Sequence, residues 1–230
     1  MMLYNNDDEL FSLMKTKLYT AVVGDILDKM HRFNQFLPYQ VKPIRDDMIV
    51  AGRAMPVLEA DIPGFEVEGA HSPLLNKNFG LMLEALDAVR KNEVYICSGS
   101  SLRYALVGEI MCTRMKYLEG AGAVVNGLHR DTQGILDINF PCFSYGSYAQ
   151  DQAPRGKVLD YRVPIDFSGI PVRPGDIVFG DRDGVLILPQ ELEAEVIERS
   201  YEKAVSENIV GKAIKEGLSA VESWNKYQIM

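Results

Sequence analysis

An acidic residue and an Arg-Asp pair are the side chains in this sequence whose spacing could serve chemistry. Glu109 follows Gly108 near the start of a predicted helix, and Arg130 and Asp131 come directly after a short apolar strand. Twenty residues separate Glu109 from Arg130, so a short helix and strand can return both ends to one edge of a sheet. Because ligands in α/β sheets bind beyond the carboxyl ends of the strands, we expect a site at that edge.

The residue types at this edge suit an anionic substrate and a cation. The planar guanidinium of Arg130 can pair with a carboxylate and an oxo group, and the Asp131 carboxylate is a hard ligand for Mg²⁺ or Mn²⁺. Free amides at a helix N-terminus also bind carboxylates. Together these groups could hold a 2-oxo acid and stabilise its enolate. The amides concerned belong to Gly108, Glu109, Ile110 and Met111.

The same residues also have a purely structural interpretation. An Arg-Asp pair after a strand is often a surface ion pair worth under about 1 kcal/mol, and a glutamate at a helix start interacts favourably with the helix dipole. His129 precedes Arg130 and should point to the opposite face of the strand, so we expect a structural role for it. Spacing alone therefore leaves a catalytic site and a structural pair both open.

Composition argues against several other classes of protein. The chain has 230 residues, of which 47% are hydrophobic and 24% charged, as in ordinary globular domains. Its net charge of −8 disfavours binding to nucleic acids or anionic membranes. We find no signal-peptide pattern and no apolar run long enough for a transmembrane helix. Three widely spaced cysteines without a CxxC motif favour reduced thiols over disulfides or structural zinc, and we expect a cytoplasmic protein.

The elements that must position this edge form a mixed α/β pattern. The segment 94–126 predicts a strand, a loop, a helix and a second strand, and strands joined in this way pair in parallel with a right-handed crossover. The expected helices cover residues 7–31 as more than one helix, 74–90 and 104–120, and the expected strands cover 49–57, 94–97 and 123–126.

The second half of the chain changes character. Short apolar runs interrupted by Pro174-Gly175-Asp176 and Asp183-Gly184 predict β-strands, and the Asp-Gly pair is a strong hairpin signal. An amphipathic, charge-rich helix follows from 191 to about 216. No linker or low-complexity stretch divides the sequence, so we expect one domain over residues 1–230.

Four segments together resemble a known family. SGSSLRYALVGEIMCTRMKYLEGAGAVVNGLHRD is similar to its core pattern of an acidic residue, twenty residues and Arg-Asp, and GIPVRPGDIVFGDRDGVLILP is similar to its PGD turn and D-x-DGV hairpin. TAVVGDILDK resembles its N-terminal helix and VAGRAMPV its first inner strand. The family is that of the regulator of ribonuclease activity A (RraA-like), and the resemblance covers roughly residues 18–210.

The resemblance implies both a fold and a reaction. The expected fold is an α/β/β/α sandwich with a core over about 18–190 and a C-terminal helical extension over about 191–230, assembled as a homotrimer or homohexamer. The family includes class II 4-hydroxy-4-methyl-2-oxoglutarate aldolases, which also decarboxylate oxaloacetate. A carbon–carbon bond beside a 2-oxo acid breaks in that reaction, and the pyruvate enolate is then reprotonated.

The resemblance also implies a role for each matching residue. Asp131 would bind the divalent cation directly, and Glu109 would orient a water on it. Arg130 would hold the oxo acid, while the amides of residues 108–111 would hold its carboxylate. Glu207 of a neighbouring subunit would approach the waters of the cation. A water held by Glu109 and Asp131 would remove the proton of the substrate alcohol.

Several positions depart from the aldolase pattern. Glu109 replaces an aspartate, Gly134 stands where another acid is frequent, and Cys97 stands where many members have Asp. Arg103 adds a cation that would suit a more anionic or phosphorylated substrate. The family's namesake leaves a second function open, a non-catalytic regulator that binds a protein; Glu109 and the C-terminal extension favour the enzyme. A methyltransferase is rejected because no glycine-rich nucleotide-binding turn is present.

Overall fold

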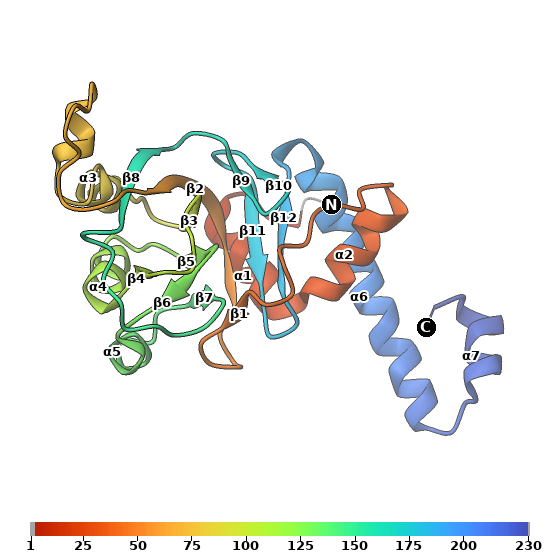
Figure 1. Cartoon of the computed structure of the whole chain (residues 1–230). Helices are drawn as coiled ribbons and strands as arrows, with labels where there is room; N and C mark the ends of the chain where they lie inside the picture. Colours follow the sequence, from red (N-terminus) through yellow and green to blue (C-terminus); the bar gives the residue numbers. More distant parts are fainter. Residues whose placement is uncertain (1–2, 230) are drawn as a thin grey trace.

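The computed structural model describes residues 3–229, which form a mixed α/β fold around one eight-stranded sheet (Figure 1). The strands in spatial order are β1 (Lys42–Pro43), β7 (Cys142–Ser144), β5 (Gly122–Val125), β3 (Glu93–Ser98), β2 (Val50–Asp61), β11 (Ile177–Gly180) and β12 (Val185–Leu188), with β8 (Gly156–Tyr161) also paired to β2. Strands β7, β5, β3 and β2 run parallel. The pairs made by β1, β8, β11 and β12 are antiparallel.

Two small sheets and a set of helices complete the described part of the chain. The strands β4 (Ala105–Val107) and β6 (Leu128–His129) pair in parallel, and β9 (Ile165–Phe167) and β10 (Ile170–Val172) pair antiparallel. The helices are α1 (Asp7–Lys17), α2 (Thr20–Lys29), η1 (Pro73–Asn76), α3 (Met82–Asp87), α4 (Glu109–Tyr117), α5 (Thr132–Asp137), η2 (Gln190–Leu192), α6 (Glu193–Lys215) and α7 (Ala220–Tyr227).

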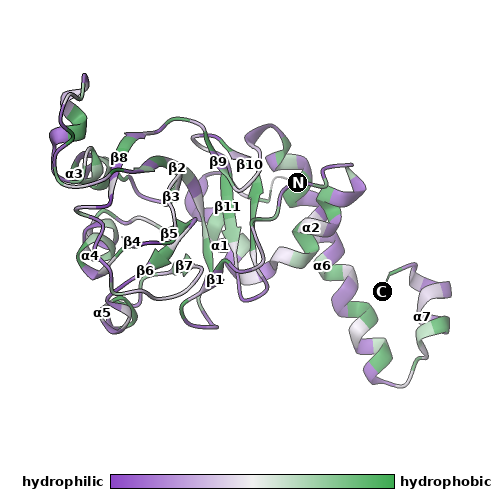
Figure 2. Ribbon diagram, viewed as in Figure 1, coloured by the Kyte–Doolittle hydropathy of each residue, from purple (hydrophilic) through white to green (hydrophobic). Residues whose placement is uncertain are grey.

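The helices form two groups around the sheet. The first group, α3, α4 and α5, lies at one end; the second has α2 and α6 at the other end and α1 behind the middle of the strands (Figure 1). Each group packs its apolar side chains on the strands in a separate buried cluster, and β2 contributes residues to both clusters and to a third one near β9 and β10. Figure 2 shows the apolar residues concentrated in the central strands. Burial of this apolar surface is the main driving force for the arrangement.

Much of the predicted pattern is present in the structure. Strands β3 and β5 pair in parallel, as the segment 94–126 predicts, and Asp183-Gly184 lies in the turn that joins β11 to β12. The N-terminal helices and the long C-terminal helix are confirmed. The expected α/β fold class is confirmed as well. Among the described residues, no helix combines the length and the apolar character needed to cross a membrane.

Two predicted helices are partly wrong. The helix expected over 104–120 begins only at Glu109, because Ala105–Val107 is a buried strand that pairs with β6. The helix expected over 74–90 is divided into η1 and α3. Gly80 breaks it with a φ of +64°, where the backbone packs so closely on Val158 that a side chain would collide with it. In both places a contact with a distant strand overrides the local helical pattern.

Candidate functional site

The site lies where the small β4–β6 sheet ends. Gly108 follows β4 and is the N-cap of α4, while Arg130 and Asp131 follow β6. Because β4 and β6 are parallel neighbours, their carboxyl ends meet at one edge. The structure therefore brings Glu109, Arg130 and Asp131 together across the twenty residues that separate them in sequence.

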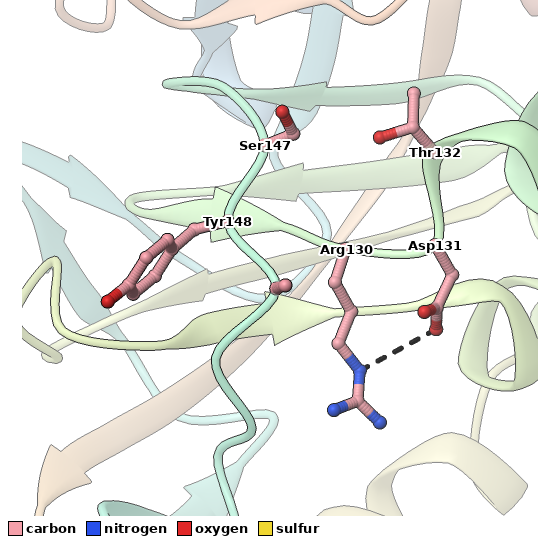
Figure 3. A pocket seen from close by; sticks show the side chains of 6 residues that line it. Arg130, Asp131, Thr132, Ser147 and Tyr148 are labelled. Carbon is pink, nitrogen blue, oxygen red and sulfur yellow. Dashed lines mark ion pairs between the residues drawn. The ribbon is translucent and has the colours of Figure 1, made fainter.

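Asp131 is held in an unusual backbone conformation. Its φ is +58°, in the left-handed region that few residues other than glycine adopt, and it is the N-cap of α5 without a side-chain cap bond. Its Oδ2 accepts from the Glu109 amide at 3.3 Å and lies 3.6 Å from Arg130 Nε. Figure 3 shows the Arg130 and Asp131 side chains extending to the same side. No described residue donates a hydrogen bond to Asp131 Oδ1, which remains available to a ligand.

Two glycines allow this close packing. A Cβ at Gly108 would lie 2.6 Å from Asp131 Oδ2, so only glycine leaves room for that carboxylate. A Cβ at Gly134 would collide with the Glu109 carboxylate, which lies directly over this glycine. Two departures from the aldolase pattern, Glu109 and Gly134, are therefore structurally linked. Glu109, longer by one methylene than aspartate, occupies the space that a side chain at 134 would otherwise fill.

The first turn of α4 offers part of the predicted anion site. The Glu109 amide already donates to Asp131. The amides of Ile110 and Met111 have no acceptor among the described residues and stay free for an anion. Ile110 itself is 84% exposed. A carboxylate bound here would meet two amides at the positive end of the helix dipole.

Asp151 belongs to the site, although no motif in the sequence points to it. Its Oδ1 accepts from Arg130 Nη1 at 2.8 Å, so Arg130 lies between two carboxylates, Asp131 and Asp151. Asp151 lies in the loop between β7 and β8, and no spacing rule links it to Arg130. The only available signal was the general tendency of polar loops to supply functional residues.

Two cavities, of about 360 and 350 Å³, share Arg130 and Asp131 as lining residues. The first is polar in character (Figure 3), and its other lining residues are Thr132, Ser147, Tyr148 and Ala149. The second is bordered mainly by apolar side chains, and its other lining residues are Phe79, Met82, Leu83, Leu86, Ala105, Val107, Gly108, Ile110, Met111, Asp151 and Gln152. Arg130, Asp131, Asp151 and the two residues with free amides therefore border a space large enough for a small metabolite, whereas Glu109 lines neither cavity.

His129 supports the site from within the protein. It is buried, and its ring nitrogens lie 2.7 Å from Ser144 Oγ and 2.9 Å from Thr132 Oγ1. Burial lowers the pKa of His129, which favours a neutral ring. With both nitrogens engaged, His129 joins β6 to β7 and α5, in keeping with the structural role expected for it.

Comparison with known proteins identifies the family. The RraA-like family model, described as Aldolase/RraA, matches residues 20–187. The chain belongs to the RraA-like family. A protein of Halalkalibacterium halodurans with the name "Putative 4-hydroxy-4-methyl-2-oxoglutarate aldolase" is 26% identical over 205 residues, which make up 89% of this chain and 89% of that protein. The matched range includes the site residues Glu109, Arg130, Asp131 and Asp151.

Two solved structures show the same RraA-like fold. An uncharacterised protein from Pseudomonas syringae pv. tomato has a TM-score of 0.83 at 24% identity and covers 99% of this chain and 98% of its own. Streptomyces coelicolor RraAS2, described as an unusual member of the RNase ES inhibitor RraA protein family, has a TM-score of 0.73 at 19% identity and covers 90% and 97%. At these identities the two structures establish the fold and not the activity.

Three other residues singled out in the sequence lie outside this RraA-like site. Glu207 belongs to α6, which lies at the opposite end of the molecule from α4 (Figure 1), and it contacts Tyr19 and Lys203 instead. Arg103 pairs with Asp61 at 2.9 Å and lines neither cavity, so the expected pocket cation is not found there. Cys97 is fully buried, and burial raises the pKa of its thiol.

The donor atoms fit one type of metal site and not another. Among the described residues, no group of three His, Cys, Asp or Glu side chains is close enough to enclose a metal ion, so an all-protein site of the zinc type does not fit. Mg²⁺ instead keeps several waters and binds through one or two carboxylates together with its substrate. Asp131, whose side chain is 45% exposed and whose Oδ1 is free, fits that description, and Mn²⁺ accepts the same oxygen ligands.

Proposed function

We propose that this RraA-like protein is a divalent-metal-dependent carbon–carbon lyase that acts on a 2-oxo acid and releases pyruvate. The observation that carries the proposal is the meeting of Arg130 and Asp131 at the border of a cavity, with the Glu109 amide bonded to Asp131 and free helix amides beside it. The name of the Halalkalibacterium halodurans relative supports it. The reactions that we propose are retro-aldol cleavage of 4-hydroxy-4-methyl-2-oxoglutarate or a similar 4-hydroxy-2-oxo acid, and decarboxylation of oxaloacetate.

Each residue has a distinct task in this proposal. Asp131 would hold Mg²⁺ or Mn²⁺, which supplies Lewis-acid stabilisation of the enolate. Arg130 binds the 2-oxo group and carboxylate through its planar fork, and the amides of Ile110 and Met111 bind the remaining carboxylate oxygen. Glu109 orients the water that takes the proton from the C4 hydroxyl. As the C3–C4 bond breaks, its electron pair forms the enolate, and C3 then receives a proton.

A homotrimer or homohexamer is part of the proposal. Helices α6 and α7 extend away from the sheet (Figure 1), and α7 leaves Val221 and Trp224 exposed. Apolar residues on a projecting helix are typical of a surface covered by another chain. Glu207, on the same projecting helix α6, would then reach the site of a neighbouring subunit.

Release of pyruvate tests the proposal directly. Purified protein is assayed with oxaloacetate, 4-hydroxy-4-methyl-2-oxoglutarate and other 4-hydroxy-2-oxo acids, with Mg²⁺ or Mn²⁺ and with EDTA. We expect release that requires the metal and falls by about 1000-fold or more in Asp131→Ala, because the residue supplies the only direct protein ligand proposed for the cation. If a folded, metal-loaded protein leaves every substrate intact, the activity is excluded, and a regulator that binds another protein becomes the better account.

A further inference from the structure

The cavity that contains the free amides is lined mostly by apolar side chains. Phe79, Met82, Leu83 and Leu86 come from α3 and the residues before it, and Ile110 and Met111 come from α4. Arg130, Asp131, Asp151 and Gln152 are its polar lining residues. From this division we infer that the substrate carries an uncharged, apolar chain on C4, and that the site disfavours 4-hydroxy-2-oxo acids whose chain ends in a carboxylate more remote than C5. The inference rests on the proposed function and narrows its substrate class.

The charges around the cavity support this assignment. Arg130 is the one cation among its lining residues, and it is already paired with Asp131 and Asp151. Once Arg130 and a cation at Asp131 hold the 2-oxo acid end of the substrate, a carboxylate at the far end of its chain would find no further cation among the lining residues. It would instead face Asp151 and an apolar wall, and a desolvated, unpaired charge is costly. A substrate with a carboxylate at the far end of its chain is thus selected against by repulsion as well as by the lack of a partner.

The amides that anchor the 2-oxo acid belong to residues of the apolar cavity, whereas Arg130 and Asp131 line both cavities. Ile110 and Met111, whose amides are free, line the apolar cavity only, whereas Thr132, Ser147 and Tyr148 line the polar cavity only. A substrate bound by these amides therefore has the apolar wall within reach of its remaining carbons. Leu83 and Ile110 are 57% and 84% exposed, and a substrate chain that covers them gains the free energy of apolar burial.

The reaction of such a substrate balances without another reactant. A molecule R–CH(OH)–CH₂–CO–COO⁻ loses its hydroxyl proton, and the C3–C4 bond breaks. The electron pair of that bond passes to the enolate, and C3 takes up a proton. The products are pyruvate and an apolar aldehyde, R–CHO, where R is an alkyl or aryl group.

Two substrates with equal carbon counts give the cleanest test. In 4-hydroxy-2-oxoheptanoate the chain ends in a methyl group, and in 4-hydroxy-2-oxoheptanedioate it ends in a carboxylate. We expect kcat/KM for pyruvate release to be at least about tenfold higher for the first, since a single mismatched group in an apolar pocket commonly costs tenfold or more. Oxaloacetate, which has no chain beyond C4, serves as the check on lyase activity itself.

Substitution of Leu83 tests whether the apolar lining of the cavity causes the preference for an uncharged substrate chain. Leu83→Arg places a cation at an exposed position of the lining and should lower the preference by about tenfold or more, whereas the uncharged Leu83→Met should keep it. Equal or faster cleavage of the dicarboxylate by the unaltered protein would overturn the inference while the lyase activity stands. Cleavage of oxaloacetate alone would do the same, and no activity on any substrate would remove both. If Leu83→Arg changes the oligomeric state in sedimentation but not the preference, the wall is a contact between copies, and the inference is wrong.

Discussion

The protein holds the two exposed acids beside Arg130 and the buried acid Glu59 in opposite ways. Glu59 lies behind the cavity wall, where it is bonded to the lining residue Gln152. Asp131 and Asp151 have side chains that are each 45% exposed, and both pair with Arg130. Glu59 is only 2% exposed and has no cation partner among the described residues. It accepts from Gln152 at 2.6 Å and from Tyr104 at 3.4 Å, and burial raises its pKa to about 8.

This difference separates a chemical role from a structural one. An exposed carboxylate with a free oxygen can take up a cation or a substrate, whereas a buried carboxyl that keeps its proton mainly serves the hydrogen bonds around it. Because Gln152 lines the cavity and donates to Glu59, the buried acid fixes one part of the cavity wall. Proximity to a cavity is therefore insufficient to assign catalysis, and access and charge pairing decide it.

After loss of Asp131 itself, the largest expected effect comes from Gly134→Ala, which moves the exposed Glu109 side chain. The added methyl group would collide with the Glu109 carboxylate and displace it from its place over Gly134, so we expect kcat/KM for pyruvate release to fall by about tenfold or more. Alanine favours a helix interior, so the melting temperature should change little.

Gly211→Ala is the matched control for this substitution. Gly211 also lies in a helix, α6, and a Cβ there would meet no atom within 4 Å. We expect its activity to be unchanged within about twofold and its stability to rise slightly. If the two alanine variants have equal activity, the position of Glu109 has no bearing on the reaction.

The part of the site that sequence could predict is local. Glu109 and Asp131 meet because a helix and then a strand follow one another between them, and periodicity with glycine stops reveals such a unit. Asp151 could not be predicted, since its contact with Arg130 depends on how the loop before β8 folds back. The predicted start of α4 is wrong for a similar reason. Residues Ala105–Val107 pair as a strand with β6, which is a contact between distant segments, and do not join the helix.

The roles of Gly134 and Arg103 show the same limit. Gly134 looked like a lost acid in the sequence, and only the structure shows that Glu109 fills its space. Arg103 looked like a substrate-binding cation, but its partner is Asp61. A sequence gives the type of a charged residue, whereas its partner depends on contacts between distant segments.

The smallest expected effect is on stability, and it concerns the buried Glu59. Its pKa is about 8 in the folded protein against 4.5 ordinarily, so between these values the folded state holds a proton that the unfolded state has lost. The contribution of Glu59 to the free energy of unfolding therefore falls as the pH rises from about 4.5 to about 8. Glu59→Gln keeps an oxygen acceptor and removes the titration.

Unfolding in urea at pH 5 and at pH 8 measures this effect. We expect Glu59→Gln to stabilise the protein more at pH 8 than at pH 5. An equal change of stability at both pH values for Glu59→Gln would mean that Glu59 is ionised in the folded protein. It would then not differ from the exposed acids in the way described here.

The proposed lyase function requires that a pyruvate enolate forms beside Arg130 and Asp131. Proton exchange tests this step without knowledge of the full substrate. Pyruvate is incubated with the protein in D₂O, and the loss of its methyl proton signal is followed by NMR. We expect exchange that requires Mg²⁺ or Mn²⁺, stops with EDTA and is abolished in Asp131→Ala. Absence of exchange in the folded, metal-loaded protein, or undiminished exchange in Asp131→Ala, would contradict it.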